Sequence, residues 1–368
     1  MSKINGITKS KVFLDSNNYL LTKTKILTYF IFTLIFLATS FLSVLFIQKY
    51  FNDKISFFTF KSLSPILLLF LGLLLILYFL FDALRFLYVF KALKINVSLN
   101  YLVKLAFINI FLSNITPFAT GGAFAQIYFL NKKNISIGDA TSATTIKTVL
   151  PIIFFFITSP IILITDKTPF KIIPSGNNLI YILLLVFIYI LAIYGFYKIL
   201  KSIDMIKKAL SKILILLVNK KIISQNKVER FKYNSFLEID IFILNIKRFL
   251  KSKKKYVLLS IVFMILYLFT LFMFPVILIK GFNSNISTGQ IISIQILLTF
   301  VTYFAPTPGA TGVAEGGFTL LFSSFIGKND IVSLTFLWRF FTMYLGMLIG
   351  LIIFYLEIAK NKLNSKTI

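Results

Sequence analysis

The sequence predicts an all-α fold: a polytopic helical membrane protein with about six full spans and two re-entrant helical hairpins, opposed to each other in an inverted-repeat arrangement. Three observations predict it. Apolar residues make up 58% of the 368 residues, against about 45–50% in soluble domains. Several uncharged runs reach the length of about 20 residues that crosses a bilayer. A short phrase containing Pro and Gly occurs in two apolar segments, 191 positions apart, at Pro117 and Pro308.

The expected elements follow in chain order. Residues 1–25 form a basic N-terminus, and the apolar run near 26–48 is too long for a signal-peptide core, so we expect it to remain as a span. Further spans near 63–84, 139–165 and 178–198 complete a first membrane half over 26–200. A basic linker covers 201–255. The second half covers 256–358, with spans near 256–280 and 331–357, and a tail covers 359–368.

The distribution of basic residues predicts the topology. The segment 198–255 holds 16 of the 39 basic residues and four acids, so the positive-inside rule places it in the cytoplasm, together with both termini. With both termini and the linker in the cytoplasm, each half must cross the membrane an even number of times. This holds only if the segments that carry the phrase, near 102–131 and 288–327, each enter the membrane and return on the same side. The first then enters from the cytoplasm and the second from outside, which is a transporter architecture.

The basic linker carries two apolar stripes at helical spacing, one starting at Ile203 and one comprising Phe236, Ile239, Ile243 and Ile246. We expect amphipathic helices that lie at the cytoplasmic interface and join the two halves. Recruitment of an anionic lipid or a partner is the alternative role.

Each repeated phrase supplies the same chemical groups. Pro ends an incoming half-helix, and Gly lets the backbone turn. Thr120 and Thr311 are expected to cap the returning half-helices, whose free N–H groups and positive dipole ends suit a phosphate or carboxylate. Tight packing through small residues is the alternative.

The candidate substrate-binding residues come from both halves. In the first half they are Thr116, Pro117, Thr120, Gly121, Gly122 and Gln126. In the second half they are Thr307, Pro308, Gly309, Thr311, Gly312, Glu315 and Arg339.

Glu315 is interpreted as the only carboxylate well inside the apolar zone, and Arg339 as its natural partner. Three roles for Glu315 stay open: carrying a coupled proton, contacting a cationic head group, or pinning the hairpin. Lys147 could neutralise a phosphate or extend to the cytoplasmic surface. Asp82 and Arg85 are expected to form an interfacial i,i+3 pair. Gly346 and Gly350 are interpreted as a packing seam.

The composition also excludes several kinds of chemistry. The chain has no Cys and no His, which removes disulfides, thiolate or imidazole metal sites, haem ligation and His-based acid–base catalysis. We therefore expect no catalytic residue, no metal and no cofactor, and do not expect an enzyme. The net charge of +27 is interpreted as basic cytoplasmic loops facing anionic lipid, not as a nucleic-acid site.

Two motifs resemble a known family. The run from Asn114 to Gly122, continuing through Gln126-Ile127-Tyr128, is similar to the first motif of the lysylphosphatidylglycerol synthase transmembrane-region family. The run from Pro306 to Phe318 is similar to its second and more specific motif, and Arg339 lies where that family has an arginine in its last span. The resemblance covers about residues 20 to 360. The chain departs from the usual first motif at Phe118 and Phe124, where small or polar residues are commoner.

The resemblance implies a flippase-like protein, similar to the flippase half of the multiple-peptide-resistance factor, without the aminoacyl-transferase domain. The expected function is movement of an anionic, zwitterionic or aminoacylated phospholipid between leaflets of the bacterial inner membrane. Further expected partners are a lipid-modifying enzyme acting in trans and other copies of the chain in a homo-oligomer. The alternatives are a proton-coupled secondary transporter of a small solute and a non-catalytic envelope-assembly protein.

Overall fold

Helices make up the regular structure of the chain wherever the computed structural model describes it, namely residues 64–166, 225–282 and 286–366 together with residues 31, 34, 38, 49, 194, 207 and 211–213. Within these ranges the all-α prediction is confirmed, and no strand occurs. The spans expected near 26–48 and 178–198, and the apolar stripe that starts at Ile203, lie outside the described residues.

Four helices in the described part of the chain are long and apolar enough to cross a membrane. They are α3 (Pro65–Ala92), α6 (Ile137–Thr165), α10 (Lys254–Gly281) and the continuous segment Asp330–Lys360. That segment runs through α13 (Lys328–Arg339), the π-helical turn η4 (Phe340–Tyr344) and α14 (Leu345–Lys366). Large apolar side chains stay exposed on these helices, as at Leu69 of α3, which is 73% exposed. Such an apolar exterior is stable only in lipid, so the chain is a membrane protein.

Shorter helices separate these long ones and occur in two matching sets. The first set is α4 (Leu99–Asn114), the 3₁₀ turn η1 (Pro117–Ala119) and α5 (Thr120–Lys132). The second is α11 (Thr288–Thr302), η3 (Pro308–Ala310) and α12 (Val313–Phe322). Each set is a helix, a 3₁₀ break and a second helix, and the breaks fall at the repeated phrase.

The repeat extends beyond the phrase. The first residues of α3 and α10 are 189 positions apart (254 minus 65), those of α4 and α11 are 189 apart (288 minus 99), and those of α6 and α13 are 191 apart (328 minus 137). The two membrane halves therefore share one order of helices in nearly constant register.

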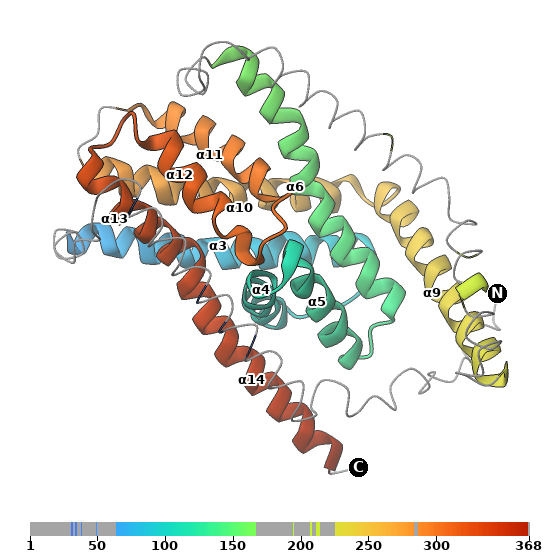
Figure 1. The fold of residues 1–368 in the computed structure, drawn as a ribbon. Helices are drawn as coiled ribbons and strands as arrows, with labels where there is room; N and C mark the ends of the chain where they lie inside the picture. Colours follow the sequence, from blue (N-terminus) through green and yellow to red (C-terminus); the bar gives the residue numbers. More distant parts are fainter. Residues whose placement is uncertain are drawn as a thin grey trace.

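The two halves pack against each other through α3 on α10 and through α14 on α4 (Figure 1). The seam between α14 and α4 depends on glycine. A Cβ at Gly350 would meet the backbone of Phe107 in α4, and one at Gly346 would lie 3.2 Å from Cδ1 of Ile110 in α4 and 2.7 Å from Cζ of Phe79 in α3. The predicted packing role of these two glycines is confirmed, because only a residue without a side chain allows this approach.

The helix α9 (Gln225–Leu250) carries the second predicted apolar stripe and packs on α6 (Figure 1). Phe236, Ile239, Ile243 and Ile246 are all half-buried, whereas Arg248 is exposed. Polar contacts fix the two helices: the backbone N–H of Gly138 donates to Glu238 Oε2, at 2.5 Å. The helical and amphipathic character predicted for this segment is confirmed.

Candidate functional site

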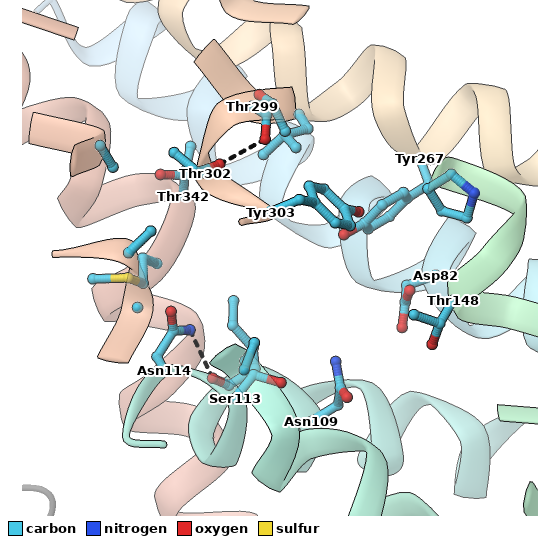
Figure 2. A pocket seen from close by; sticks show the side chains of 18 of the residues that line it. Asp82, Asn109, Ser113, Asn114, Thr148, Tyr267, Thr299, Thr302, Tyr303 and Thr342 are labelled. Carbon is cyan, nitrogen blue, oxygen red and sulfur yellow. Dashed lines mark hydrogen bonds between the residues drawn. The ribbon is translucent and has the colours of Figure 1, made fainter. Parts of the chain in front are cut away.

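A cavity of about 490 Å³ lies where the two broken segments meet. The turns η1 and η3 contact each other, and α4 contacts η3, so the two phrases lie side by side although they are far apart in the sequence. Residues of α3, α4, α6, α10, α11 and both breaks line the cavity. Figure 2 shows Asn109, Ser113 and Asn114 from α4 on one side of it, with Thr299, Thr302 and Tyr303 from the end of α11 on another.

The first break turns through two residues in the left-handed backbone region, Phe118 (φ 53°) and Ala119 (φ 54°). Left-handed conformation costs a residue with a Cβ about 1–2 kcal/mol, so neighbouring hydrogen bonds must maintain this turn. Thr116 supplies them: its Oγ1 accepts from the N–H of Gly121 at 2.8 Å and donates to the carbonyl of Leu112 at 2.7 Å.

The second break has the same left-handed pair, Gly309 (φ 59°) and Ala310 (φ 53°), followed by Gly312 (φ 86°). Here the N–H of Gly312 donates to Glu315 Oε2 at 2.7 Å. The carboxylate of Glu315 thus satisfies the free N–H of Gly312, the N-cap residue of α12.

The capping roles predicted for Thr120 and Thr311 are wrong. The hydroxyl of Thr120 donates to the carbonyl of Pro117 at 3.0 Å, and that of Thr311 donates to the carbonyl of Pro308 at 2.7 Å. Both hydroxyls close the turn by donating to a carbonyl three residues earlier: Thr120 is already the first residue of α5, and Thr311 precedes Gly312, the N-cap residue of α12. Thr116 and Glu315 accept from these N–H groups instead.

The predicted pair of Glu315 and Arg339 is confirmed. Arg339 Nε donates to Glu315 Oε1 at 2.8 Å, and Arg339 Nη2 donates to the carbonyl of Gly309 at 2.6 Å. The arginine therefore ties the break η3 to helix α13. Glu315 is 0% exposed, both of its carboxylate oxygens accept hydrogen bonds, and it is not part of the cavity wall, whereas Arg339 is.

A second ionic cluster, formed by Asp82, Arg85 and Lys147, lines the cavity. Arg85 donates to Asp82 Oδ1 through Nε at 2.8 Å and also through Nη2. Lys147 Nζ donates to Asp82 Oδ2 at 2.7 Å. The i,i+3 pair is confirmed, and it is buried among the helices. Lys147 is 4% exposed, which contradicts its extension to a surface. Asp82 also contradicts the interpretation of Glu315 as the only deep carboxylate.

Tyrosines surround this cluster. The guanidinium of Arg85 lies 4.0 Å from the centroid of the Tyr267 ring, and the hydroxyls of Tyr267 and Tyr78 are 2.9 Å apart. Tyr303 completes the aromatic part of the wall (Figure 2). The cation–π contact and the hydroxyl pair hold the guanidinium plane in one orientation.

Several polar atoms of the cavity wall are buried without a hydrogen-bond partner. They are Arg85 Nη1, Gln126 Nε2, Gln295 Oε1 and Trp338 Nε1. Leaving a polar atom unpaired costs about 1–3 kcal/mol, so such atoms are expected where a ligand or water completes them. Three of the four atoms are donors, a set that suits an acceptor-rich, negatively charged group.

The predicted site residues therefore fall into two groups. Gln126, Thr307, Gly309 and Arg339 line the cavity. The others form the breaks or support them from behind: Thr116, Pro117, Thr120, Gly121, Gly122, Pro308, Thr311, Gly312 and Glu315. The close packing is clearest at Gly121, where a Cβ would lie 2.6 Å from Cγ2 of Thr116.

Sequence reasoning missed Asp82, Arg85, Tyr78, Tyr267 and Tyr303 as members of this wall. A usable signal existed, since three ionisable residues, including Lys147, interrupt segments of otherwise apolar character. Among the described residues no group of acidic side chains is arranged to hold a metal ion.

Comparison with known proteins agrees with this architecture. The model of the family described as the lysylphosphatidylglycerol synthase TM region matches residues 57–350. A "UPF0104 membrane protein" of Archaeoglobus fulgidus is 26% identical over 327 residues, covering 86% of this chain and 94% of that protein. No solved structure matches.

Proposed function

The chain belongs to the family of the lysylphosphatidylglycerol synthase transmembrane region, and from this premise we propose that it is a lipid translocase. It moves a phospholipid with an anionic, zwitterionic or aminoacylated head group between the leaflets of the cell membrane, and it catalyses no chemical reaction on that lipid. An aminoacylated substrate would be supplied by a lipid-modifying enzyme acting in trans.

One observation carries the proposal: two helix breaks, repeated in the sequence, meet at a cavity whose wall includes charged and polar side chains between apolar helices. Lipid cannot satisfy the backbone groups that a break exposes, so broken helices persist where they line a cavity or a pathway. In transporters this is the arrangement of the substrate site.

The size and chemistry of the cavity support a head group as the occupant. Its volume of about 490 Å³ lies within the roughly 300–1,000 Å³ of small-molecule sites, too small for a whole phospholipid. The head group would occupy the cavity while the acyl chains stay in the bilayer, as expected if moving charge through hydrocarbon is the barrier to be lowered.

We propose that the membrane topology is six full spans with two re-entrant hairpins, α4-η1-α5 and α11-η3-α12, opening to opposite sides. This rests on the charge parity and on the repeated helix order. The chain has no Cys, so single Cys probes can be introduced without background. A thiol probe at Asn131 should react with an impermeant reagent from the cytoplasm and one at Asn329 from outside. Reaction of both from the same side would refute the inverted arrangement.

The function is tested by reconstituting the purified chain in liposomes that carry a fluorescent phospholipid and measuring how much label an impermeant quencher reaches with time. A matched pair of variants controls for added bulk. Ser113→Trp fills the cavity from α4, and Leu69→Trp adds the same side chain on the apolar exterior of α3. We expect transport by the unmodified chain and by Leu69→Trp, and its loss in Ser113→Trp. Transport no faster than in protein-free liposomes would refute the proposal.

The alternative, proton-coupled transport of a small solute, differs from lipid translocation in that its substrate needs no acyl chains. The geometry gives it little support, because both oxygens of Glu315 already accept hydrogen bonds and the side chain is 0% exposed. Uptake of the water-soluble head group alone, at the rate of the intact lipid, would favour the solute transporter.

A further inference from the structure

We propose that Arg85 and Lys147 form a binding subsite for the phosphodiester anion of the lipid head group, and that Asp82 is a built-in counter-ion that holds the two cations in place. The inference rests on the proposed function and specifies which part of the cavity recognises which part of the lipid. The subsite joins α3, which carries Asp82 and Arg85, to α6, which carries Lys147.

The balance of charge distinguishes this cluster from the other ionic pair. Glu315 and Arg339 form one acid and one base, which neutralise each other. At the first cluster two cations share one carboxylate, so a charge of +1 is left without a counter-ion among the described residues. A buried net charge is costly unless an opposite charge meets it, so the cluster favours a monoanion in the cavity.

Donor geometry supports the same conclusion. The carboxylate of Asp82 accepts hydrogen bonds from Nε and Nη2 of Arg85 and one from Nζ of Lys147. Arg85 Nη1 is buried with no partner, and an ammonium group has three hydrogens. Both cations therefore keep donors for a ligand while Asp82 fixes their positions, and both residues line the cavity.

A phosphodiester fits these donors better than other head-group chemistry. Its two non-bridging oxygens share one negative charge, so one can accept from Arg85 and the other from Lys147. A cationic group would meet the net positive charge, and an uncharged sugar would not balance it. The ring of Tyr267 beneath the guanidinium, at 4.0 Å, reduces the freedom that binding would otherwise remove.

Asp82 gives the subsite a property that a transporter needs. Two buried cations without a counter-ion would repel each other in the empty state and hold an anion too tightly for release. With Asp82 in place, the empty subsite stays assembled, and the arriving phosphate meets one unit of charge, not two.

The test is a series of variants that changes the charge of the cluster. The charge is +1 in the unmodified chain, 0 in Lys147→Met, +1 in Lys147→Arg, and +1 again in the double variant Asp82→Asn/Lys147→Met. Each full-length variant is purified in detergent, and its affinity is measured for fluorescent phosphatidylglycerol and for a fluorescent glucosyl-diacylglycerol with the same acyl chains but no phosphate. Fluorescence of Trp338, the only tryptophan, verifies that each variant is folded.

We expect Lys147→Met to bind phosphatidylglycerol about tenfold more weakly, as the loss of one charge-assisted contact implies, with the affinity for the glycolipid unchanged. Lys147→Arg should keep most of the affinity. The double variant should recover to within about threefold of the unmodified chain, because it restores the charge of +1. Recovery would show that the net charge of the cluster sets the affinity for the phosphate, and the unchanged affinity for the glycolipid distinguishes this from a general structural effect.

Two results would overturn the subsite. One is an equal loss for both lipids in Lys147→Met and in the double variant, which would make the cluster structural. The other is inorganic phosphate displacing the labelled lipid at the lipid's own concentration, which would assign the subsite to free phosphate. In either case the unmodified chain could still move lipid, so the proposed function would stand. Absence of lipid movement by the unmodified chain would refute that function.

Discussion

Replacing Glu315 by Gln should destabilise the protein strongly, and replacing Arg339 by Gln as well should restore part of the loss. The two side chains form a buried pair at 2.8 Å, in which Glu315 is 0% and Arg339 7% exposed. Each single replacement leaves one charge buried without its partner, whereas the double replacement leaves none. The prediction is therefore a strongly non-additive pair of mutations.

The magnitude follows from the bonds that are lost. Glu315 accepts one hydrogen bond from Arg339 and one from the backbone N–H of Gly312. Charge-assisted bonds contribute about 1.5–3 kcal/mol each, so Glu315→Gln should cost about 3–5 kcal/mol, the range for breaking a buried ion pair. Independent effects of the two variants would add to about 6–10 kcal/mol, and we expect the double variant to lie about 3 kcal/mol below that sum.

The chain provides its own optical probe for this measurement. Trp338 is the only tryptophan and precedes Arg339 in α13. Its ring stacks on Phe318 of α12, with centroids 4.5 Å apart, so its fluorescence reports whether these two helices remain packed together. Unfolding in mixed micelles of increasing denaturing detergent, followed by this fluorescence, gives the free energy of unfolding for all four members of the cycle.

The lipid-movement assay separates the two roles that remain for the pair. A double variant that recovers stability but moves no lipid would show that Arg339 also serves the cavity that it lines. A double variant that recovers both would leave the pair a structural tie of the hairpin. Simple addition of the two single losses would refute the reasoning, because it would mean that the residues do not interact.

Three further predictions concern the breaks. Gly121→Ala should destabilise the protein by about 1–3 kcal/mol, because its Cβ would clash with Thr116, and Gly312→Ala by about 1–2 kcal/mol, because of its positive φ. The control Gly316→Ala has open space around its Cβ and lies within α12, so it should be neutral or stabilising in the same unfolding assay. Phe118→Gly should stabilise by about 0.5–1 kcal/mol, since it relieves left-handed strain at a side chain that is 62% exposed; a loss of stability would show that the ring makes essential contacts. The first amides of α5 should exchange hydrogen faster than those of α12, because a threonine hydroxyl holds the first break and an ion pair holds the second; equal rates would contradict this difference.

Much of the described fold could be predicted from local features of the sequence. Hydropathy located α6, α10 and the final span to within about three residues, because a helix in lipid needs a long apolar run whatever its neighbours are. It located the start of α3 equally well, but α3 continues to Ala92, eight residues beyond the expected end at 84, where charged residues follow the apolar run. The repeated phrase located both breaks, because Pro and Gly act on the backbone at their own positions. The pair of Glu315 and Arg339 was predictable because few charges were available as partners.

The details of the site depended on contacts that a linear reading does not contain. Asp82 and Lys147 are 65 positions apart and meet only because α3 packs beside α6, so neither one's sequence neighbourhood indicated the pairing. The capping roles of Thr120 and Thr311 were predicted wrongly because the oxygen that reaches a free N–H depends on the left-handed residues at Phe118 and Gly309. The left-handed conformation of a Phe is not expected from its residue type.

The two halves have placed their buried charges differently. In the second half the acid of the returning helix, Glu315, pairs with Arg339, 24 positions later. Subtracting the repeat distance of 191 gives Phe124 and Thr148 as the corresponding residues of the first half. The ionic tie between returning helix and following helix is thus absent there, and Phe124 is 69% exposed.

In the first half the buried base is Lys147, one residue before the counterpart of Arg339, and its acid lies on α3 and not on α5. Lys147, which corresponds to Trp338, pairs with Asp82 of α3, whose repeat counterpart is Met273 of α10. This pair joins α3 to α6 and leaves η1 and α5 without a buried charge to hold them. The side-chain hydroxyl of Thr116 holds the first break, whereas an ion pair holds the second. Rearranging the first break therefore costs less free energy than rearranging the second. A carrier that exposes one cavity to two leaflets in turn needs one mobile and one fixed element. Because the first break is held more weakly, α5 is the element expected to move against a fixed α12.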